Sequence, residues 1–294
     1  MDMTLLLQQS INGLAIGSVY ALVAIGLSLI WATARLLDFA FGEVFMLGGV
    51  ITWTAMVTAG LPMAVAMVAA IATCFMGGVF VQRSLYHRLS NEDHVIVLAA
   101  TIGVSMIVKD GATKIWGSET LVFPILFNEV WFIGDIAIRT HFVFIAFTAI
   151  MLIAFLHTVI SRTRIGMAMR AVAESRSIAG MMGVNVQLML ALAFGLSYLL
   201  AATAGALIGP VHYIQTTGGT SMMIKGVAAA VLGGFGSLPG ALLGGLLIGQ
   251  IEALSAGFIS SAFKDVIVFA TFIVVLFFRP EGLLGEKRQG VSAI

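Results

Sequence analysis

Long stretches without a formal charge constrain this sequence more than any other feature. Asp, Glu, Lys and Arg are missing from 3–34, 44–82, 177–224 and 226–251, and 140–161 holds only two His as ionisable residues. A helix needs roughly 20 apolar residues to cross a bilayer, and this chain is 60% hydrophobic with a mean hydropathy of +1.07. The alternating segments of about 10 residues that mark a membrane barrel are not seen. The sequence therefore predicts an all-α, polytopic transmembrane helical bundle.

The apolar stretches divide into about eight spans plus a broken, re-entrant segment. The expected helices are 10–31, 39–59, 63–82, 94–115, 141–161, 186–208, a broken pair within 222–257, and 264–279. We expect a single transmembrane domain over 1–294. The first apolar stretch is interpreted as a span rather than a cleavable signal, because no Lys or Arg precedes Arg35 and no small-residue cleavage site follows.

Basic residues gather in alternate loops between these spans. One side would carry Arg35, Arg83, Arg88, Arg162, Arg164, Arg170, Arg176, Arg279, Lys287 and Arg288, out of 15 Lys and Arg in all. Cytoplasmic loops carry the excess of Lys and Arg. This pattern predicts a multi-pass protein with its N-terminus outside and its C-terminus in the cytoplasm.

A cluster of helix-breaking residues interrupts the pair within 222–257. The run VLGGFGSLPGALLGG, 231–245, contains Gly233, Gly234, Gly236, Pro239 and Gly240. In a helix interior each Gly costs about 1 kcal/mol and Pro ~3 kcal/mol, so the helix should break here. Irregular backbone at membrane depth must be buried in protein or line a cavity, and broken helices are typical of transport routes. The alternative is a Gly-rich packing seam.

Three ionisable residues lie well inside the expected spans: Glu43, Lys225 and Glu252. Such groups are costly in a membrane and usually face a bundle interior or a cavity. With the five residues of the helix break, we predict them as translocation-path or gate residues. The alternative is an interhelical ion pair or a group that reaches an interface, which is favoured for Lys225 and more strongly for Asp38 and Asp265 near the span ends.

Motifs for catalysis and cofactor binding are missing from the sequence. It contains no GxxxxGK[ST], HExxH or GxSxG pattern, and its single cysteine, Cys74, excludes an intrachain disulfide. We therefore expect no catalytic residue, no metal site and no cofactor in this chain, and no enzyme activity. If transport is energy-driven, either another subunit hydrolyses the nucleotide or an ion gradient drives it.

The stretch RTRIGMAMRAVAESRSIAG, 162–180, is a basic, Ala-rich island in this apolar chain. Arg170 and Glu174 are spaced i,i+4, and the composition predicts one short helix from Gly166 to Ala179. Small residues such as Ala171 would let another surface approach closely. The stretch is typical of a cytoplasmic helix that a partner pushes, and the alternative is a surface connector.

Four separated motifs of this sequence occur in the same order in one known family. They are INGLAIGSVYALVAIGLSLIW, LLDFAFGEVFMLGG, RTRIGMAMRAVAESRSIAGMMGVNV and IKGVAAAVLGGFGSLPGALLGGLLIGQIEAL, followed by the tail FFRPEGLLG. Over nearly its whole length the chain resembles ABC importer permeases of the branched-chain amino acid type, the LivH-like permeases. It differs from their usual NFAHGE pattern by having Asp38 and Phe41 in the Asn and His places, and Phe41 removes a hydrogen-bonding group.

The resemblance implies a permease subunit of the inner membrane that forms the path for a branched-chain amino acid or a similar small polar nutrient. The implied partners are a LivM-like second permease subunit, two cytoplasmic ATPases that use the ATP, a periplasmic substrate-binding protein and membrane lipid, with no nucleic acid. The segment 162–183 would be the coupling loop, with docking residues Gly166, Arg170, Ala171, Glu174, Ala179 and Gly183.

Two other classes of protein remain as alternatives. In an ion-gradient-driven secondary transporter or channel, Glu43, Lys225 and Glu252 would carry ions. An integral-membrane enzyme would need a cluster of His or carboxylate residues, and the Asp and Glu residues here are scattered along the chain.

Overall fold

The structure is a computed structural model that describes residues 3–89, 92–124, 130–133 and 136–285. Its helices are α1 (Met3–Ala34), α2 (Phe41–Val57), α3 (Met63–Val81), α4 (His94–Trp116), α5 (Thr140–Arg162), α6 (Arg164–Glu174), α7 (Arg176–Met181), α8 (Val186–His212), α9 (Gly219–Gly233), α10 (Leu238–Phe258) and α11 (Lys264–Phe278). A π-helical turn, Gln82–Tyr86, extends α3. The strands β1 (Val130–Ile133) and β2 (Ile136–Arg139) pair antiparallel and form a small hairpin that the sequence did not predict.

The polytopic helical fold predicted from the sequence is confirmed, but a count of eight spans is not. Among the described residues, six helices are long and apolar enough to cross a membrane: α1, α3 with its π-turn, α4, α5, α8 and α10. The apolar helices α2 and α9 are shorter, with 17 and 15 residues. Helix boundaries agree with the predicted ones to within a few residues, except that α1 begins seven residues earlier.

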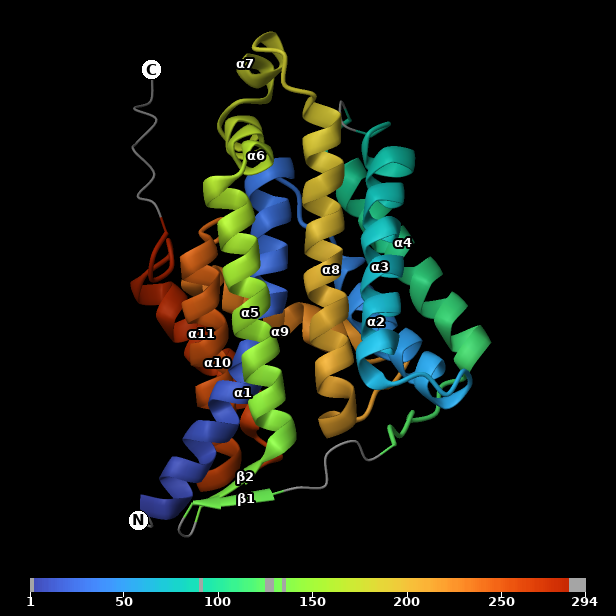
Figure 1. The fold of residues 1–294 in the computed structure, drawn as a ribbon. Coiled ribbons are helices and arrows are strands. Elements are labelled where there is room, and N and C mark those ends of the chain that lie inside the picture. Colours follow the sequence, from blue (N-terminus) through green and yellow to red (C-terminus); the bar gives the residue numbers. More distant parts are fainter. Residues whose placement is uncertain (1–2, 90–91, 125–129, 134–135, 286–294) are drawn as a thin grey trace.

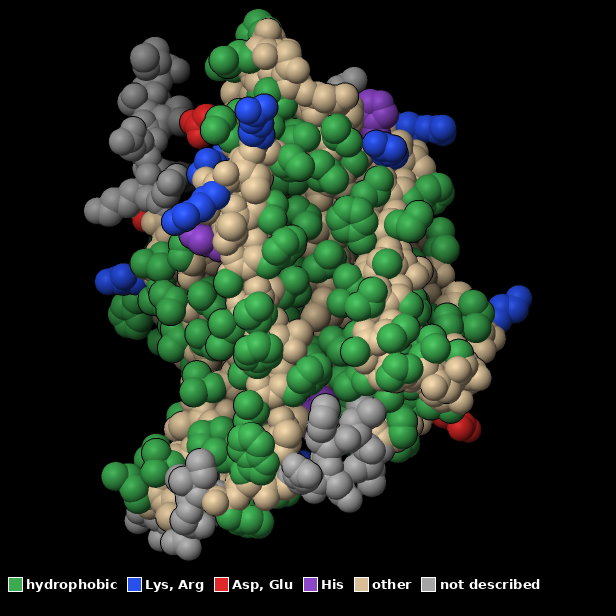
Figure 2. All heavy atoms as spheres, in the orientation of Figure 1, with side chains coloured by type: hydrophobic (Ala, Val, Ile, Leu, Met, Phe, Trp, Pro, Cys, Tyr) green, Lys and Arg blue, Asp and Glu red, His purple; other side chains and the backbone are tan. Residues whose placement is uncertain are grey.

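Inner and outer helices differ sharply in burial. The most apolar windows of α1 and α8 are 89% and 83% buried, whereas those of α3, α4 and α5 are only 28%, 17% and 22% buried. Figure 1 shows α1 and α8 running through the bundle from the end with the β-hairpin, here called the hairpin end, to the end with α6 and α7, the α6–α7 end. Apolar side chains cover the middle of the face in Figure 2, and basic side chains gather mainly at the α6–α7 end.

Helices α1 and α10 are packed backbone against backbone. A Cβ added to Gly17 would come within 3.0 Å of the Leu246 Cα, and a Cβ on Gly249 would overlap the Gly17 backbone. A side chain at Gly245 would likewise overlap the backbone of Ala21. Small residues allow this close approach of membrane helices. The Gly-rich packing seam left open as the alternative for 231–245 is thus present at Gly245, and it continues along α10 to Gly249.

Two non-helical segments turn back into the bundle from opposite ends. After α1 ends at the α6–α7 end, residues 35–40 return far enough for Phe41 to pack on Gly26 of α1. After α8 ends at the hairpin end, residues 213–218 return far enough for Gly219 to meet Gly42, where a Cβ on Gly42 would lie 2.5 Å from the Gly219 carbonyl oxygen. As a result, α2 and α9 both begin inside the bundle.

The predicted helix break lies between α9 and α10. Gly234 and Gly236 adopt φ values of +109° and +92°, which favour glycine. Ser237 then caps α10, with its hydroxyl accepting from the Gly240 N–H at 3.2 Å. The Phe235 ring packs on Trp31 at 4.9 Å, three residues before the end of α1. The break is therefore near the α6–α7 end, and the irregular backbone deeper in the bundle is that of 35–40 and 213–218.

The single helix predicted over Gly166–Ala179 is wrong, because the segment forms two helices. Ser175 has an extended conformation, with φ −154° and ψ 113°, that ends α6 and begins α7. Its hydroxyl accepts from the Ile178 N–H, which favours the start of a new helix. The Ala and Met content of the segment predicted a continuous helix, but it did not indicate that the Ser175 cap would start a second one.

Candidate functional site

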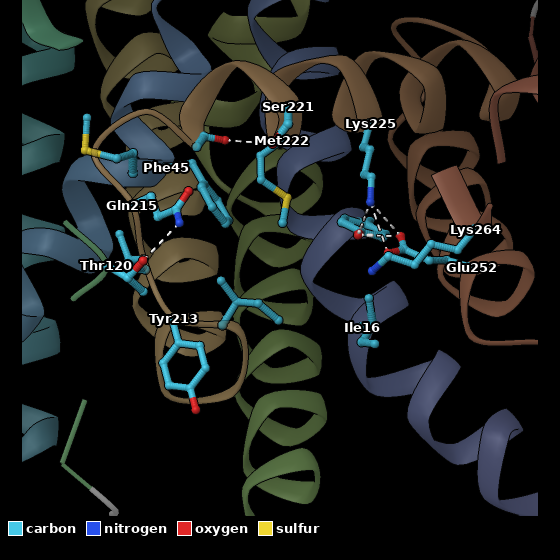
Figure 3. Close-up of a pocket in the computed structure, with 15 residues that line it drawn as sticks. Ile16, Phe45, Thr120, Tyr213, Gln215, Ser221, Met222, Lys225, Glu252 and Lys264 are labelled. Atoms are coloured by element: carbon cyan, nitrogen blue, oxygen red, sulfur yellow. Dashed lines mark hydrogen bonds and ion pairs between the residues drawn. The ribbon is translucent and has the colours of Figure 1, made fainter. Parts of the chain in front are cut away.

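A cavity of about 410 Å³ opens between α1, α2, α9, α10 and the returning segment 213–218. Figure 3 shows Lys225, Glu252 and Lys264 together on one side of it, Thr120 and Gln215 on the other, and Met222 between them. The Gln215 amide donates to the Thr120 hydroxyl at 2.9 Å. The volume is within the usual range for small-molecule sites, 300–1,000 Å³.

Two residues predicted from the sequence, Lys225 and Glu252, are brought together at the cavity wall. The Lys225 Nζ lies 3.0 and 3.1 Å from the two carboxylate oxygens of Glu252. The hydroxyl of Tyr20 on α1 donates to the Glu252 Oε2 at 2.6 Å and lies 3.3 Å from the Lys225 Nζ. Lys225 and Glu252 are only 8% and 4% exposed. Because a buried charge is costly unless it is paired, this contact fixes α9 to α10.

A second pair of charges joins the first from the start of α11. Lys225 also contacts the Asp265 Oδ1 at 2.7 Å, and the Lys264 Nζ lies 2.9 Å from the Glu252 Oε1. Asp265 thus forms the interhelical pair that the sequence left open as one alternative. The side chains of Lys264 and Asp265 are 30% and 53% exposed. The cluster holds two positive and two negative groups and is formally neutral.

Glu43 lies apart from this cluster, where α2 and α9 begin. It is 1% exposed, and its Oε1 accepts from the Thr220 hydroxyl at 3.2 Å. Its Oε2 has no hydrogen-bond partner among the described residues, although Ser105 and Lys109 of α4 lie near the same carboxylate. Helix N-termini carry a partial positive charge that favours anions. Glu43 therefore sits between two positive helix ends.

The residues of the helix break do not line the cavity. Gly233 and Gly240 face each other so closely that a Cβ on either would overlap the other's backbone. Pro239 lies in the first turn of α10, where a proline is tolerated. The N–H groups of Leu283 and Leu284 donate to the carbonyls of Leu232 and Gly233, both at 2.9 Å. A role of the break in transport stays a prediction.

Asp38 is buried and bonded between helices, so of the two alternatives left open for it, contact with other helices holds and a position at an interface does not. Its side chain is fully enclosed and accepts from the hydroxyls of Tyr86 at 2.9 Å and Tyr198 at 2.7 Å, and from the Ala40 N–H at 3.0 Å. These bonds hold residues 35–40 against α3 and α8. Phe41 is completely buried and meets the Tyr198 ring edge-on at 6.3 Å, so an apolar residue fits this position.

The predicted coupling residues fall into an outward and an inward group. Arg170, Ala171, Glu174 and Gly183 are exposed at the α6–α7 end. Gly166 and Ala179 are buried, and a Cβ on Gly166 would overlap the backbone of Ile160. The inward pair therefore positions α6 and α7 on the bundle, and only the outward group is free to touch another surface.

Arg176 connects the coupling segment to the inner helix α1. One of its terminal nitrogens donates to the Thr33 carbonyl at 3.1 Å and to the Ala34 carbonyl. These are C-terminal carbonyls of α1, where a positive side chain is favoured. The sequence placed Arg176 in a basic island without assigning it this role.

Comparison with known proteins identifies the family. Residues 9–276 match the model of the branched-chain amino acid transport system permease component. The chain belongs to this family. The matched range contains the cavity, the charged cluster and both α6 and α7, so the family resemblance seen in four motifs is confirmed over nearly the whole chain.

Several relatives are similar from end to end. The chain is 35% identical to the high-affinity branched-chain amino acid transport system permease protein LivH of Escherichia coli strain K12, and 34% identical to LivH of Salmonella typhimurium. It is 35% identical to the permease protein BraD of Pseudomonas aeruginosa. Each alignment covers 95% of this chain and 96% of the relative.

Proposed function

We propose that this chain is a permease subunit of an ABC importer and forms the membrane path for a branched-chain amino acid or a similar small polar nutrient. The observation that carries the proposal is the end-to-end similarity, at 34–35% identity, to permeases named for high-affinity branched-chain amino acid transport. A membrane chain with a partly polar cavity between its helices agrees with such a role. The whole chain would act as one transmembrane domain.

The proposed path runs beside Lys225 and Glu252 and past the meeting point of α2 and α9 at Glu43. Irregular backbone inside a membrane bundle is tolerated where it lines a cavity, and Gln215 of the returning segment 213–218 lines this one. The turn with Gly233, Gly234, Gly236, Pro239 and Gly240 would support the path by letting α9 and α10 fold against each other, rather than by touching the solute.

The energy would come from partner subunits, and this chain would hold no cofactor of its own. We propose that α6 and α7 dock on a cytoplasmic ATPase through Arg170, Ala171, Glu174 and Gly183. Large apolar side chains surround them at the same end: Met167, Ile178, Met181 and Met182 are 56–79% exposed. Exposed apolar groups rimmed by charges are typical of protein contact surfaces. Gly166 and Ala179 would set the angle of these helices.

The complete importer would contain a LivM-like second permease subunit, two ATPases and a periplasmic substrate-binding protein. In the bacterial inner membrane, the α6–α7 end would face the cytoplasm, because Arg35, Arg83 and the arginines of 162–176 lie there. The N-terminus would then be outside. With the short helices α2 and α9 and the terminal helix α11 added to the six long helices, the chain would reach about eight membrane segments.

The test of this function is co-purification of the tagged chain with the ATPases encoded beside it. We expect Arg170→Glu combined with Ala171→Trp to reduce ATPase recovery at least tenfold, because both side chains lie on the outward surface. The control is Lys114→Glu with Ile115→Trp, which likewise reverses one positive charge and introduces one Trp at exposed positions of α4. Equal recovery from both variants, together with uptake driven by an ion gradient, would favour a secondary transporter instead.

A further inference from the structure

The cavity beside Lys225 has two chemically different walls. One end is charged, with Lys225, Glu252 and Lys264, and the Tyr20 hydroxyl beside them. Ile16 beside this end, and Met222 and Phe45 toward Gln215, add apolar surface, and Ser221 adds a hydroxyl next to Met222. A ligand with a charged end and an apolar body that packs on Ile16, Phe45 and Met222 fits these walls.

The charged end offers both signs to a ligand without changing its own net charge. Lys225 is held by Glu252, Asp265 and the Tyr20 hydroxyl, so it is the fixed centre of the cluster. Lys264 makes one contact of 2.9 Å to the Glu252 Oε1, and it is three times as exposed as Lys225 by side-chain fraction, 30% against 10%. Lys264 is therefore the cation that can exchange Glu252 for a ligand carboxylate, leaving the Glu252 Oε1 to accept from a ligand ammonium group.

The formally neutral cluster favours zwitterionic ligands over ligands with a net charge. A zwitterion adds one charge of each sign and leaves every charge of the cluster paired. A ligand with a net charge leaves one charge without an opposite partner beside the buried Lys225 and Glu252, which is costly. Ile16, Phe45 and Met222 offer no polar side-chain atom apart from a thioether, so they favour an aliphatic ligand body, while Ser221, Thr120 and Gln215 line the cavity at other points. Met222 is flexible and can fit differently branched aliphatic groups.

We propose that this cavity is a substrate-binding site within the permease itself, which takes an aliphatic α-amino acid. The ligand carboxylate contacts Lys264, its ammonium group contacts Glu252, and its side chain packs on Met222, Phe45 and Ile16. This inference rests on the proposed function, and it assigns to the permease a selection step separate from that of any binding protein. These contacts orient the ligand with its charged groups toward α11.

The test is photolabelling of the assembled importer, without its binding protein, by a diazirine analogue of leucine. The labelled peptides are then mapped by mass spectrometry. We expect label on the α9 peptide that contains Met222, and we expect excess leucine to remove it at least tenfold better than glutamate or lysine. Labelling that leucine does not compete away, or that all three amino acids remove equally, would overturn the proposal.

Two variants on α9 separate cavity binding from general damage. Met222→Trp fills the apolar wall and should reduce leucine-sensitive labelling at least tenfold. Ile224→Trp makes the same change at a residue that is 51% exposed, and it should leave the labelling unchanged. Equal labelling of both variants would contradict the proposal. Recovery of the ATPases with each variant reports whether the importer is still assembled.

A third variant tests the assignment of the two ends. In the native importer, leucine should compete at least tenfold better than leucinamide, which lacks the carboxylate. Lys264→Met should bring this ratio close to one, an effect that a purely structural lysine would not produce. An unchanged ratio would contradict the assigned carboxylate contact.

Failure of this inference and failure of the proposed function give different results. If ATP-driven leucine uptake with the binding protein persists while no leucine-sensitive label is found, the cavity is not a binding site and the function stands. If neither ATPase recovery nor ATP-driven uptake is observed, the function itself is wrong.

Discussion

Glu43 on α2 and Thr220 on α9 are joined by a hydrogen bond of 3.2 Å at the point where both helices begin. The two helices arrive there from opposite ends of the bundle, and Gly42 and Gly219 bring their backbones into contact. A buried carboxylate is tolerable here because two helix N-termini face it. This contact joins the two parts of the chain whose backbone is irregular inside the bundle.

Replacing Glu43 by glutamine keeps the shape and removes the charge. We expect Glu43→Gln to lower the free energy of unfolding by about 1–2 kcal/mol, the upper range for a charge at a partly buried helix end. Thermal unfolding of the purified protein in detergent measures the change. Thr220→Val is the comparison that removes the hydrogen bond and leaves the charge. A glutamine variant as stable as the native protein would show that the helix ends do not interact with this carboxylate.

The two lysines on Glu252 should differ in their effect on stability. Lys225→Met removes a cation that holds both Glu252 and Asp265, and breaking such a buried pair costs roughly 3–5 kcal/mol. Lys264→Met removes a more exposed cation and should cost about 0–1 kcal/mol. Unfolding of the two variants under the same conditions makes the comparison. Equal losses of unfolding free energy in the two variants would mean that the burial of Lys225 does not make its ion pairs more important for stability.

Arg176 should affect the coupling of ATPase movement to α1 more than the docking of the ATPases on α6 and α7. Arg176→Ala removes two bonds to the end of α1, and bonds from a charged donor contribute about 1.5–3 kcal/mol each. We expect ATP-driven uptake to fall at least tenfold while recovery of the ATPases stays within twofold. Arg83→Ala, at an exposed arginine of the same end, is the control. Loss of ATPase recovery with Arg176→Ala would instead assign this residue to the docking surface.

Asp38 should tolerate asparagine and reject leucine. Asparagine keeps an acceptor for one tyrosine and offers its amide to the other, whose hydroxyl can rotate to accept, so the loss should stay near 1 kcal/mol. Leucine leaves the hydroxyls of Tyr86 and Tyr198 without this partner, and each unpaired buried group costs about 1–3 kcal/mol. The measurement is the midpoint of thermal unfolding of each variant. A leucine variant as stable as the asparagine variant would contradict the bonding seen around Asp38.

Most helix boundaries could be predicted because they depend on local chemistry. The uncharged runs set the long helices, and the positive φ values of Gly234 and Gly236 end α9 where the glycine cluster indicated. The pairing of Lys225 with Glu252 was also within reach, since isolated charges in apolar spans need partners. The geometry of this pair could not be predicted, because the two residues are 27 positions apart and the segment between them includes the turn that folds α10 back on α9.

The features that sequence reasoning missed depend on contacts between distant segments. The return of residues 35–40 into the bundle relies on Asp38 meeting Tyr198, 160 residues away. A tyrosine in an apolar span needs a partner for its hydroxyl when buried, so Tyr86 and Tyr198 were the available signal. The split at Ser175 was a close competition between helix propensity and a side-chain cap, which local composition does not decide.

The glycine contacts between α1 and α10 determine how the molecule can deform. Backbone touches backbone at Gly17, Gly245 and Gly249, so at these three positions no side chain separates the two helices. Tyr20, which holds Glu252, and Ala34, which holds Arg176, are separated by about 21 Å of continuous helix at 1.5 Å per residue. We therefore expect a displacement at Ala34 to be carried along α1 to the wall of the cavity.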